Sequence, residues 1–185
     1  MSKRKVFVTV GTTNFPKLIK AITTKKVIES LLDSGYDFVQ LQTGNNFTDF
    51  QLHIELDMAC EIRKENSSTI VNLGNKITLK YDIFFENFQQ EISSSDLVIS
   101  HAGAGTCLEV LRNKKNLIVV VNEDLMDNHQ TELAEELQNG GYLYYCTCDN
   151  LDIVLRKKFN ALKQYPLPTD YIFSQYLGKC VGFIE

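Results

Sequence analysis

The amino-acid sequence predicts an α/β fold in which a parallel sheet carries helices on both faces. Strand-like and helix-like segments alternate along most of the chain, the pattern of parallel strands joined by helical crossovers. Two strand-like segments run directly into glycine-containing loops that open helices. Helix stop signals, Gly35 and Asn139-Gly140-Gly141, follow two of the helix-like segments.

Short apolar runs bounded by turn residues predict the strands. The first run, residues 5–10, is β-branched and apolar, and residues 117–121 are the most apolar of all. Such runs are typical of strands that are buried on both faces. The predicted strands are residues 5–10, 36–42, 77–81, 97–100, 117–121 and 142–146.

Capping residues mark the predicted helices. We expect Asn14 to cap the first helix, Pro16 to lie in its first turn and Gly35 to end it, so that one continuous helix joins the first two strands. The predicted helices are residues 18–32, 84–93, 106–111, 128–137 and 151–159.

Residues 47–74 interrupt this alternation and are predicted to be an insertion. The segment is polar, has a moderately helical centre at residues 52–63 and breaks at Glu65-Asn66-Ser67-Ser68. It contains His53, which we expect at the surface. Because connections of this length are usually functional or disordered, we expect a mobile excursion from the domain.

Residues 166–185 are predicted to be a linker and a helix that follow a single domain of residues 1–165. Tyr165-Pro166-Leu167-Pro168 forms the linker. Apolar residues at positions 173, 177, 181 and 184 form one helical stripe. The stripe fits docking on its own domain and docking on another chain.

Composition excludes several classes of protein. The chain has 185 residues, a hydrophobic fraction of 44% and a formal net charge of −4, which are values of an ordinary globular domain and not of a nucleic-acid binder. No apolar run approaches the roughly 20 residues that span a bilayer. The apolar run near the N-terminus is too short for a signal peptide, so we expect a cytoplasmic protein.

The five cysteines are expected to be buried or half-buried reduced thiols. Cys146-Thr147-Cys148 has CxC spacing, not the CxxC spacing of zinc or thioredoxin-like sites. A redox role of this pair is the alternative. No acidic DxD pair stands at a strand end, and the spacing of Asp124 and Asp127 is weak evidence. We therefore expect neither a metal nor another cofactor.

The run Ser100-His101-Ala102-Gly103-Ala104-Gly105-Thr106 follows a predicted strand and opens a helix. Glycine lets backbone approach a ligand closely, and the N–H groups at a helix start favour a phosphate. Glu109, about one turn further, would reach a sugar diol. Neither the dinucleotide fingerprint nor Gly-Lys-Ser/Thr is present. The run indicates a nucleotide or phosphate site, and tight strand–helix packing is the alternative.

A second loop of this kind is Gly11-Thr12-Thr13-Asn14, which follows the first predicted strand. Because ligands of open parallel sheets bind at the carboxyl ends of the strands, we expect both loops to lie at one edge.

Three ordered stretches, residues 6–13, 96–109 and 122–130, resemble one glycosyltransferase family. This family comprises the cytosolic catalytic subunits of the eukaryotic two-subunit UDP-GlcNAc transferases that act on dolichol-diphosphate-GlcNAc. The resemblance covers most of the chain outside residues 47–74. More distantly, the chain is similar to the donor-binding half of the bacterial peptidoglycan GlcNAc transferase, a GT-B enzyme, and to small exopolysaccharide transferase subunits that work as split pairs.

The resemblance implies a half-enzyme. A GT-B glycosyltransferase has two Rossmann-like domains with the active site between them, and this chain would form the UDP-sugar-binding half. A membrane-anchored partner subunit would bind the lipid-linked GlcNAc acceptor and recruit the chain to the cytosolic face of the endoplasmic reticulum. The C-terminal helix would help to bind that partner. The implied reaction is the inverting transfer of a second, β-1,4-linked GlcNAc in N-glycan precursor synthesis.

The matching motifs also imply roles for single residues. Backbone N–H groups of residues 103–106 would hold the diphosphate of UDP-GlcNAc. Glu109 would accept both ribose hydroxyls, or be a solvated acid. His129 and Gln130 would meet GlcNAc hydroxyls, or only begin a helix. His101 would reach the diphosphate or the acceptor, or be structural. The candidate catalytic residues are His101 and His129, and the candidate donor-binding residues are Gly11, Thr12, Thr13, Ala102, Gly103, Ala104, Gly105, Thr106, Glu109, Asn128 and Gln130.

The general base is not evident among the acids of this sequence, and a base on the partner chain is one of the alternatives left open. Two other functions stay open on the sequence: a split polysaccharide glycosyltransferase of bacterial type, and a nucleotide-sugar-binding module without catalysis of its own. A transferase assay with and without a membrane-anchored partner separates an enzyme from a binding module.

Overall fold

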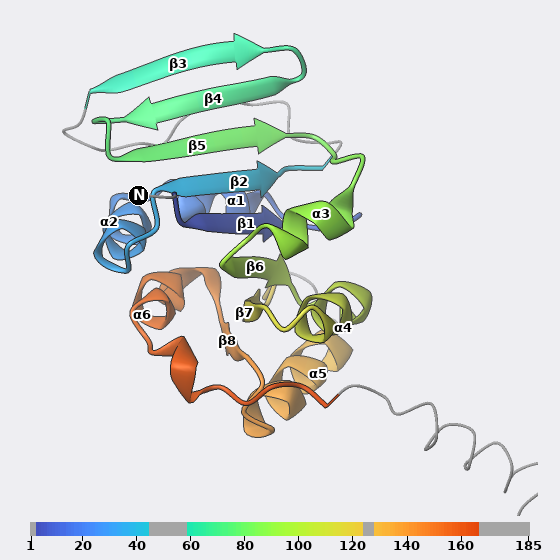
Figure 1. Cartoon of the computed structure of the whole chain (residues 1–185). Helices are drawn as coiled ribbons and strands as arrows, with labels where there is room; N and C mark the ends of the chain where they lie inside the picture. Colours follow the sequence, from blue (N-terminus) through green and yellow to red (C-terminus); the bar gives the residue numbers. More distant parts are fainter. Residues whose placement is uncertain (1–2, 45–58, 124–127, 167–185) are drawn as a thin grey trace, which may run out of the picture.

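Figure 1 shows the computed structural model of the chain, which describes residues 3–44, 59–123 and 128–166. At residues 128–130 it describes the backbone alone. His53 and the predicted C-terminal helix lie outside the described residues, so their predictions stay predictions.

One sheet organises the described part of the chain. Its strands lie in the order β3-β4-β5-β2-β1-β6-β7-β8, and the six strands from β5 to β8 in this order are parallel. The arrowheads of β1, β2 and β5 point to the same side in Figure 1. The strands are β1 (Lys5–Thr9), β2 (Phe38–Gln42), β3 (Cys60–Glu65), β4 (Ser68–Leu73), β5 (Ile77–Asp82), β6 (Leu97–His101), β7 (Asn116–Val120) and β8 (Tyr144–Cys146).

Helices cover both faces of the sheet, as predicted. On one face, Val6 and Val8 belong to a core with residues of α1, α2 and α6. On the other face, Phe7 belongs to a second core with residues of α3, α4 and α5, and its ring meets Phe85 and Phe88 edge-on, each with centroids 5.6 Å apart. The helices are α1 (Pro16–Ile22), α2 (Lys25–Asp33), α3 (Phe88–Ser93), α4 (Ala104–Arg112), α5 (Asn128–Asn139) and α6 (Leu151–Leu155).

Two short 3₁₀ turns, Cys148–Asn150 and Phe159–Ala161, flank α6. The helix predicted over residues 151–159 is therefore shorter than expected. The glycine stop signals are confirmed, since Gly35 and Gly141 both have positive φ angles just past a helix.

The prediction of one helix over residues 18–32 is wrong, because α1 and α2 are separate. The hydroxyls of Thr23 and Thr24 donate to the carbonyls of Lys20 and Ala21, at 2.8 and 2.7 Å. Thr24 then adopts an extended conformation at the start of α2. Threonine hydroxyls that bond back to the preceding turn compete with helix continuation, and here they end it.

The predicted cap at Asn14 is also wrong. Phe15 occupies the capping position, and no side chain caps α1. Pro16 is the first helical residue, as expected. A buried aromatic side chain at the helix entry takes the place of a polar cap, since Phe15 is only 2% exposed.

The interruption at residues 47–74 contains a β-hairpin where helix and excursion were predicted. Strands β3 and β4 are antiparallel and joined by Asn66 and Ser67, and β4 pairs with β5, so the hairpin extends the sheet. Asn66 has a φ of +52°, which suits a two-residue hairpin turn. The predicted break at residues 65–68 is this turn, and the predicted helix is wrong at residues 60–63.

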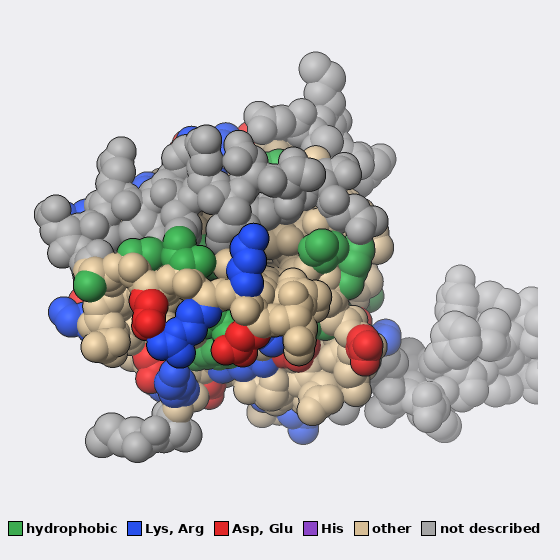
Figure 2. All heavy atoms as spheres, turned by 90° about the horizontal axis from the view of Figure 1, so that it is seen from above, with side chains coloured by type: hydrophobic (Ala, Val, Ile, Leu, Met, Phe, Trp, Pro, Cys, Tyr) green, Lys and Arg blue, Asp and Glu red, His purple; other side chains and the backbone are tan. Residues whose placement is uncertain are grey.

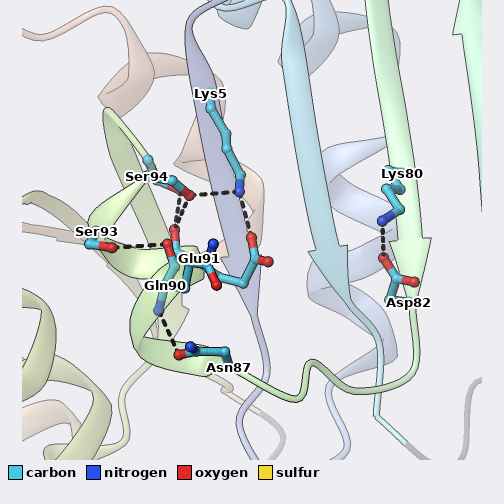
Figure 3. A network of polar contacts seen from close by, with 9 residues as sticks. Lys5, Lys80, Asp82, Asn87, Gln90, Glu91, Ser93 and Ser94 are labelled. Carbon is cyan, nitrogen blue, oxygen red and sulfur yellow. Dashed lines mark hydrogen bonds and ion pairs between the residues drawn. The ribbon is translucent and has the colours of Figure 1, made fainter.

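A half-buried ion pair fixes α3 against the central strand. The ammonium of Lys5 in β1 contacts the carboxylate of Glu91 and donates to Ser94 Oγ at 3.0 Å (Figure 3). Asn87 caps α3 by accepting from the N–H of Gln90. A cap and an ion pair therefore hold this short helix, which borders the site described next.

Among the described residues, we find no helix that is long and apolar enough to span a membrane.

Candidate functional site

The two glycine loops lie side by side because of the strand order. The chain passes from β1 to β2 on one side and later returns to β6 on the other side of β1. Thr9 at the end of β1 pairs with Ser100 near the end of β6. In open α/β sheets, such a reversal of strand order opens a crevice at the carboxyl ends of the strands. Gly11 and Gly103 both follow these ends, as the sequence predicted.

The imidazole of His101 lies between the two loops. A Cβ added to Gly11 would come within 2.5 Å of His101 Cε1, and one added to Gly103 would come even closer to Nε2. Side chains at these two positions would collide with the ring. The tight packing that the sequence left as an alternative is thus present, but it is packing of both loops around one histidine.

The surroundings of His101 favour its neutral form. The residue is 8% exposed, and burial lowers the pKa of its imidazole, while a backbone contact with Thr9 works in the opposite direction. Its buried Nδ1 has no hydrogen-bond partner among the described atoms. A neutral ring can donate one hydrogen bond and accept one, but it adds no positive charge to the site.

Helix α4 begins at this crevice with an uncapped N-terminus. Gly103 is the capping residue, and it offers no side-chain acceptor. The first intrahelical bond runs from the N–H of Cys107 to the carbonyl of Gly103, at 3.0 Å. The N–H of Gly103, predicted to hold the diphosphate, instead donates to the carbonyl of His101 at 2.8 Å. The N–H groups of residues 104–106 have no acceptor within the helix. A Cβ on Gly105 would meet no atom within 4 Å, so the approach to this turn is open.

Glu109 lies on α4, one turn beyond its start, and is half-buried. Its carboxylate accepts a hydrogen bond from the side-chain amide of Gln89 on α3. Asn113 donates to the backbone carbonyl of Glu109 at 2.9 Å. The carboxylate thus lies on the side of α4 that faces α3. Sequence reasoning missed Gln89, because no motif contains it.

The other predicted residues of the two loops lie at the same edge. Thr12 is exposed, and the half-buried Thr13 donates its hydroxyl to the carbonyl of Val10 at 2.7 Å. Ala102 is 3% exposed and belongs to the core beneath α4. Thr13 therefore shapes the first loop, and Thr12 is free to meet a ligand.

Residues 128–130 open α5, the helix that follows β7. Ala134 and Leu137 of this helix belong to the same core as Val110 and Leu111 of α4. The start of α5 thus comes from the strand next to β6. The side chains of Asn128, His129 and Gln130 lie outside the described residues, and their predicted contacts with the sugar stay predictions.

Two of the buried cysteines, Cys107 and Cys146, have thiols that burial makes unreactive. Cys146 and Cys148 are buried, and burial raises the pKa of the Cys107 and Cys146 thiols to about 12, so that little thiolate forms at neutral pH. Cys60 is exposed, which contradicts the expectation of buried or half-buried thiols. Over the described ranges, no group of three or more potential ligands could hold a metal ion.

Charges of both signs are mixed on the face seen in Figure 2. Lysine, arginine, aspartate and glutamate side chains lie among one another on the described part of that face. This matches the small net charge of −4.

Comparison with known proteins places this chain in a family. Residues 5–170 match the model of the glycosyltransferase family 28 C-terminal domain. The chain is 40% identical over 143 residues to human UDP-N-acetylglucosamine transferase subunit ALG13. The aligned region covers 77% of this chain and 11% of that protein. The chain therefore spans about a tenth of the length of that curated relative.

Solved structures of similar fold are also found. The solution NMR structure of an ALG13 protein superimposes with a TM-score of 0.72 at 31% identity, and covers 95% of this chain and 96% of that one. MurG from Acinetobacter baumannii matches in fold, with a TM-score of 0.60 at 19% identity over 87% of this chain and 43% of that one. The two-loop crevice around His101 is thus built on the fold of these proteins, and the chain belongs to the glycosyltransferase family 28 C-terminal domain family, with the ALG13 subunits as relatives.

Proposed function

We propose that this chain is the donor-binding subunit of a UDP-GlcNAc transferase that adds the second, β-1,4-linked GlcNAc to dolichol-diphosphate-GlcNAc. One observation carries the proposal. Two glycine loops converge on His101 at the reversal of strand order, and an uncapped helix N-terminus opens beside them. The printed name of the human relative, a UDP-N-acetylglucosamine transferase subunit, supports the choice of nucleotide sugar.

Two parts of the site suit a nucleoside diphosphate, one for its phosphates and one for its ribose. The free N–H groups and the positive dipole end of α4 attract the diphosphate. Glu109, one turn along the same helix, then accepts the two ribose hydroxyls. Its hydrogen bond from Gln89 holds the carboxylate on the α3 side of α4. The sugar would extend toward the start of α5, and the predicted contacts of His129 and Gln130 with the GlcNAc hydroxyls belong to this proposal.

The reaction replaces one bond to the anomeric carbon by another. The acceptor hydroxyl attacks that carbon, its proton passes to a base, and the bond to the diphosphate oxygen breaks. This chain stabilises the negative charge of the departing UDP through the helix dipole and backbone N–H groups. Because His101 is neutral, it serves as a hydrogen-bonding group and not as a cation. The partner subunit supplies the base, and no metal or other cofactor takes part.

The partner in this proposal is a membrane-anchored subunit that binds the lipid acceptor. It would hold the chain at the cytosolic face of the endoplasmic reticulum, and residues 166–185 would contribute to its binding. In this proposal residues 1–185 bind the donor and the partner orients the acceptor, and orientation of reactants is worth several kcal/mol. The isolated chain is therefore expected to bind the donor and to transfer little sugar.

Calorimetry tests the donor site directly. We expect UDP and UDP-GlcNAc to bind the isolated chain, and uridine without phosphates to bind far more weakly. Gln130→Ala should weaken UDP-GlcNAc more than UDP, because the residue is assigned to the sugar. Equal affinity for uridine and UDP would overturn the diphosphate assignment.

A transferase assay tests the division of labour. UDP-GlcNAc and a short lipid-diphosphate-GlcNAc acceptor are incubated with this chain, with the partner, or with both. We expect turnover only with both. Removal of residues 170–185 should abolish co-purification with the partner, while the remaining domain keeps its cooperative unfolding, followed by circular dichroism, and its UDP binding. Full activity of the single chain would overturn the half-enzyme proposal.

A further inference from the structure

Two buried side chains hold the backbone of Gly11 from both sides. The N–H of Gly11 donates to Thr9 Oγ1 at 3.0 Å, and the carbonyl of Gly11 accepts from Gln42 Nε2 at 3.3 Å. The circle is closed by Thr9 Oγ1, which donates to Gln42 Oε1 at 2.8 Å. Thr9 and Gln42 lie opposite each other at the ends of β1 and β2. The three residues form one closed ring of hydrogen bonds.

The direction of each bond follows from the chemistry of the groups. The Gly11 N–H can only donate, so Thr9 Oγ1 accepts from it and has its own hydrogen free for Gln42. The amide oxygen of Gln42 takes that hydrogen, which leaves its NH₂ group for the Gly11 carbonyl. Only this orientation of the amide satisfies all three donors. The ring therefore specifies one conformation of the loop.

Burying a polar pair at this place lowers the stability of the fold unless hydrogen bonds compensate. Thr9 is fully buried and Gln42 is 6% exposed, and a buried amide or hydroxyl without partners destabilises the fold. An apolar pair would fill the same space between two parallel strands. The pair instead fixes a glycine whose φ is +62°, a conformation with no regular backbone bonding of its own.

The same glycine contacts the ring of His101. A Cβ on Gly11 would reach His101 Cε1 at 2.5 Å, and the backbone of Thr9 also contacts the imidazole. A shift of Gly11 would therefore loosen His101 at the crevice. The hydrogen bonds of both side chains end on each other and on Gly11, so we attribute their effect on binding to Gly11.

We propose that Thr9 and Gln42 are positioning residues of the donor site, which set the conformation of the Gly11 loop and, through it, the place of the His101 imidazole. The inference rests on the proposed function for its effect on the nucleotide. Its effect on His101 is independent of any ligand.

The variants Thr9→Val and Gln42→Met remove the ring while they preserve the volumes. Another threonine–amide pair of the same sheet is the matched control: Thr78 Oγ1 donates to Asn72 Oδ1 at 3.0 Å between β5 and β4. Thr78→Val and Asn72→Leu break that bond far from the crevice. Thr9→Ser keeps the hydroxyl and should behave as the parent chain does.

The first readout is the imidazole titration of His101 in the free chain, followed by NMR and assigned with His101→Asn. In Thr9→Val and Gln42→Met the pKa should rise by about half a unit as water reaches the ring. In both control variants and in Thr9→Ser it should not move. An unchanged His101 titration in the two test variants overturns the proposal, as does their unfolding while the control variants stay folded.

The second readout is UDP affinity by calorimetry. Thr9→Val and Gln42→Met should each lose on the order of tenfold, about the value of one buried hydrogen bond, and the double variant should lose little more because the ring acts as a unit. If the parent chain binds no UDP, the proposed function fails while the titration still decides the positioning role. If UDP affinity is equal in test and control variants, the positioning role at the donor site is overturned.

Discussion

The centre of the sheet and its hairpin edge differ in where they place polar groups. In β6 all residues from Leu97 to His101 are buried, and in β1 only Lys5 is partly exposed. In β3 all residues from Cys60 to Glu65 are exposed. The centre nevertheless holds buried polar side chains at its carboxyl end: Thr9, Gln42, Ser100 and His101.

This difference separates polar residues that the fold alone accounts for from polar residues that point to a binding site. On the exposed edge, a polar or charged side chain is solvated and costs little. In the buried centre, each polar side chain needs a partner or destabilises the fold. Thr9, Gln42, Ser100 and His101 lie where two loops and a helix start converge, and in the proposals above they belong to the donor site. Four changes, from the largest expected effect to the smallest, test this contrast.

The largest effect is expected when a methyl group is added to the loops at the centre. In Gly11→Ala and Gly103→Ala, the new Cβ would collide with the His101 ring. Gly11 also has a positive φ that disfavours alanine. We expect each variant to lose about 1–3 kcal/mol of stability and to bind UDP at least about tenfold more weakly.

Gly105→Ala is the control for the stability effect of both substitutions, while its UDP affinity is not a control because residue 105 is assigned to the diphosphate. It lies in the same loop-to-helix segment, but its Cβ would meet nothing within 4 Å. Because alanine favours a helix over glycine by up to about 1 kcal/mol, this variant should be as stable as the parent or more so. Denaturant titration and calorimetry measure both quantities. A stable, fully binding Gly103→Ala would contradict the packing of the loop on His101.

The second prediction concerns Glu109→Ala. Two ribose hydrogen bonds would be lost, each worth roughly 0.5–1.5 kcal/mol net, so UDP affinity should fall about tenfold. Stability should change little, because the Gln89 contact is at the surface. Glu29→Ala removes an exposed acid from α2 on the other face of the sheet and is the control. Calorimetry that finds equal UDP affinity for both variants would overturn the ribose assignment.

The sequence alone predicts most of the buried centre. Apolar runs identify β1, β6 and β7 within a residue or two, because strands that are buried on both faces must be apolar throughout. Both glycine loops are found for a local reason as well, since each directly follows such a strand. Glu109 is predicted because its distance from the helix start is fixed by helix geometry.

The sequence does not predict contacts between distant segments. Gln42 meets Thr9 across 33 positions, and Gln89 meets Glu109 across 20. The hairpin was misread because β3 is exposed on both sides and so lacks the alternation of a half-buried strand. Its clearest local signal was Asn66 between two strand-length runs. The break between α1 and α2 also has a local signal, the adjacent threonines Thr23 and Thr24.

The third prediction is a pH dependence of stability that comes from His101. Burial holds its folded-state pKa below the unfolded value of about 6.5, so the unfolded chain binds more protons between the two values. Stability should therefore rise with pH through this window, and fall as the pH drops below about 6.5, by at most about 1.4 kcal/mol per pH unit. His101→Asn should remove this part of the slope. Denaturant unfolding at several pH values measures it, and parallel slopes for both chains would contradict the buried neutral ring.

The smallest effect is expected at the hairpin edge. Ile62 in β3 is 52% exposed and pairs with the fully buried Val71 of β4. Ile62→Thr keeps a β-branched side chain in the strand, so stability should stay within about 0.5 kcal/mol of the parent. UDP affinity should not change, because β4, β5, β2 and β1 separate β3 from the Gly103 loop after β6. Val71→Ala changes the residue that pairs with Ile62. It should destabilise the chain clearly, while the folded fraction keeps its UDP binding. A loss of UDP affinity in Ile62→Thr would mean that the edge and the centre are coupled, and would break the contrast between them.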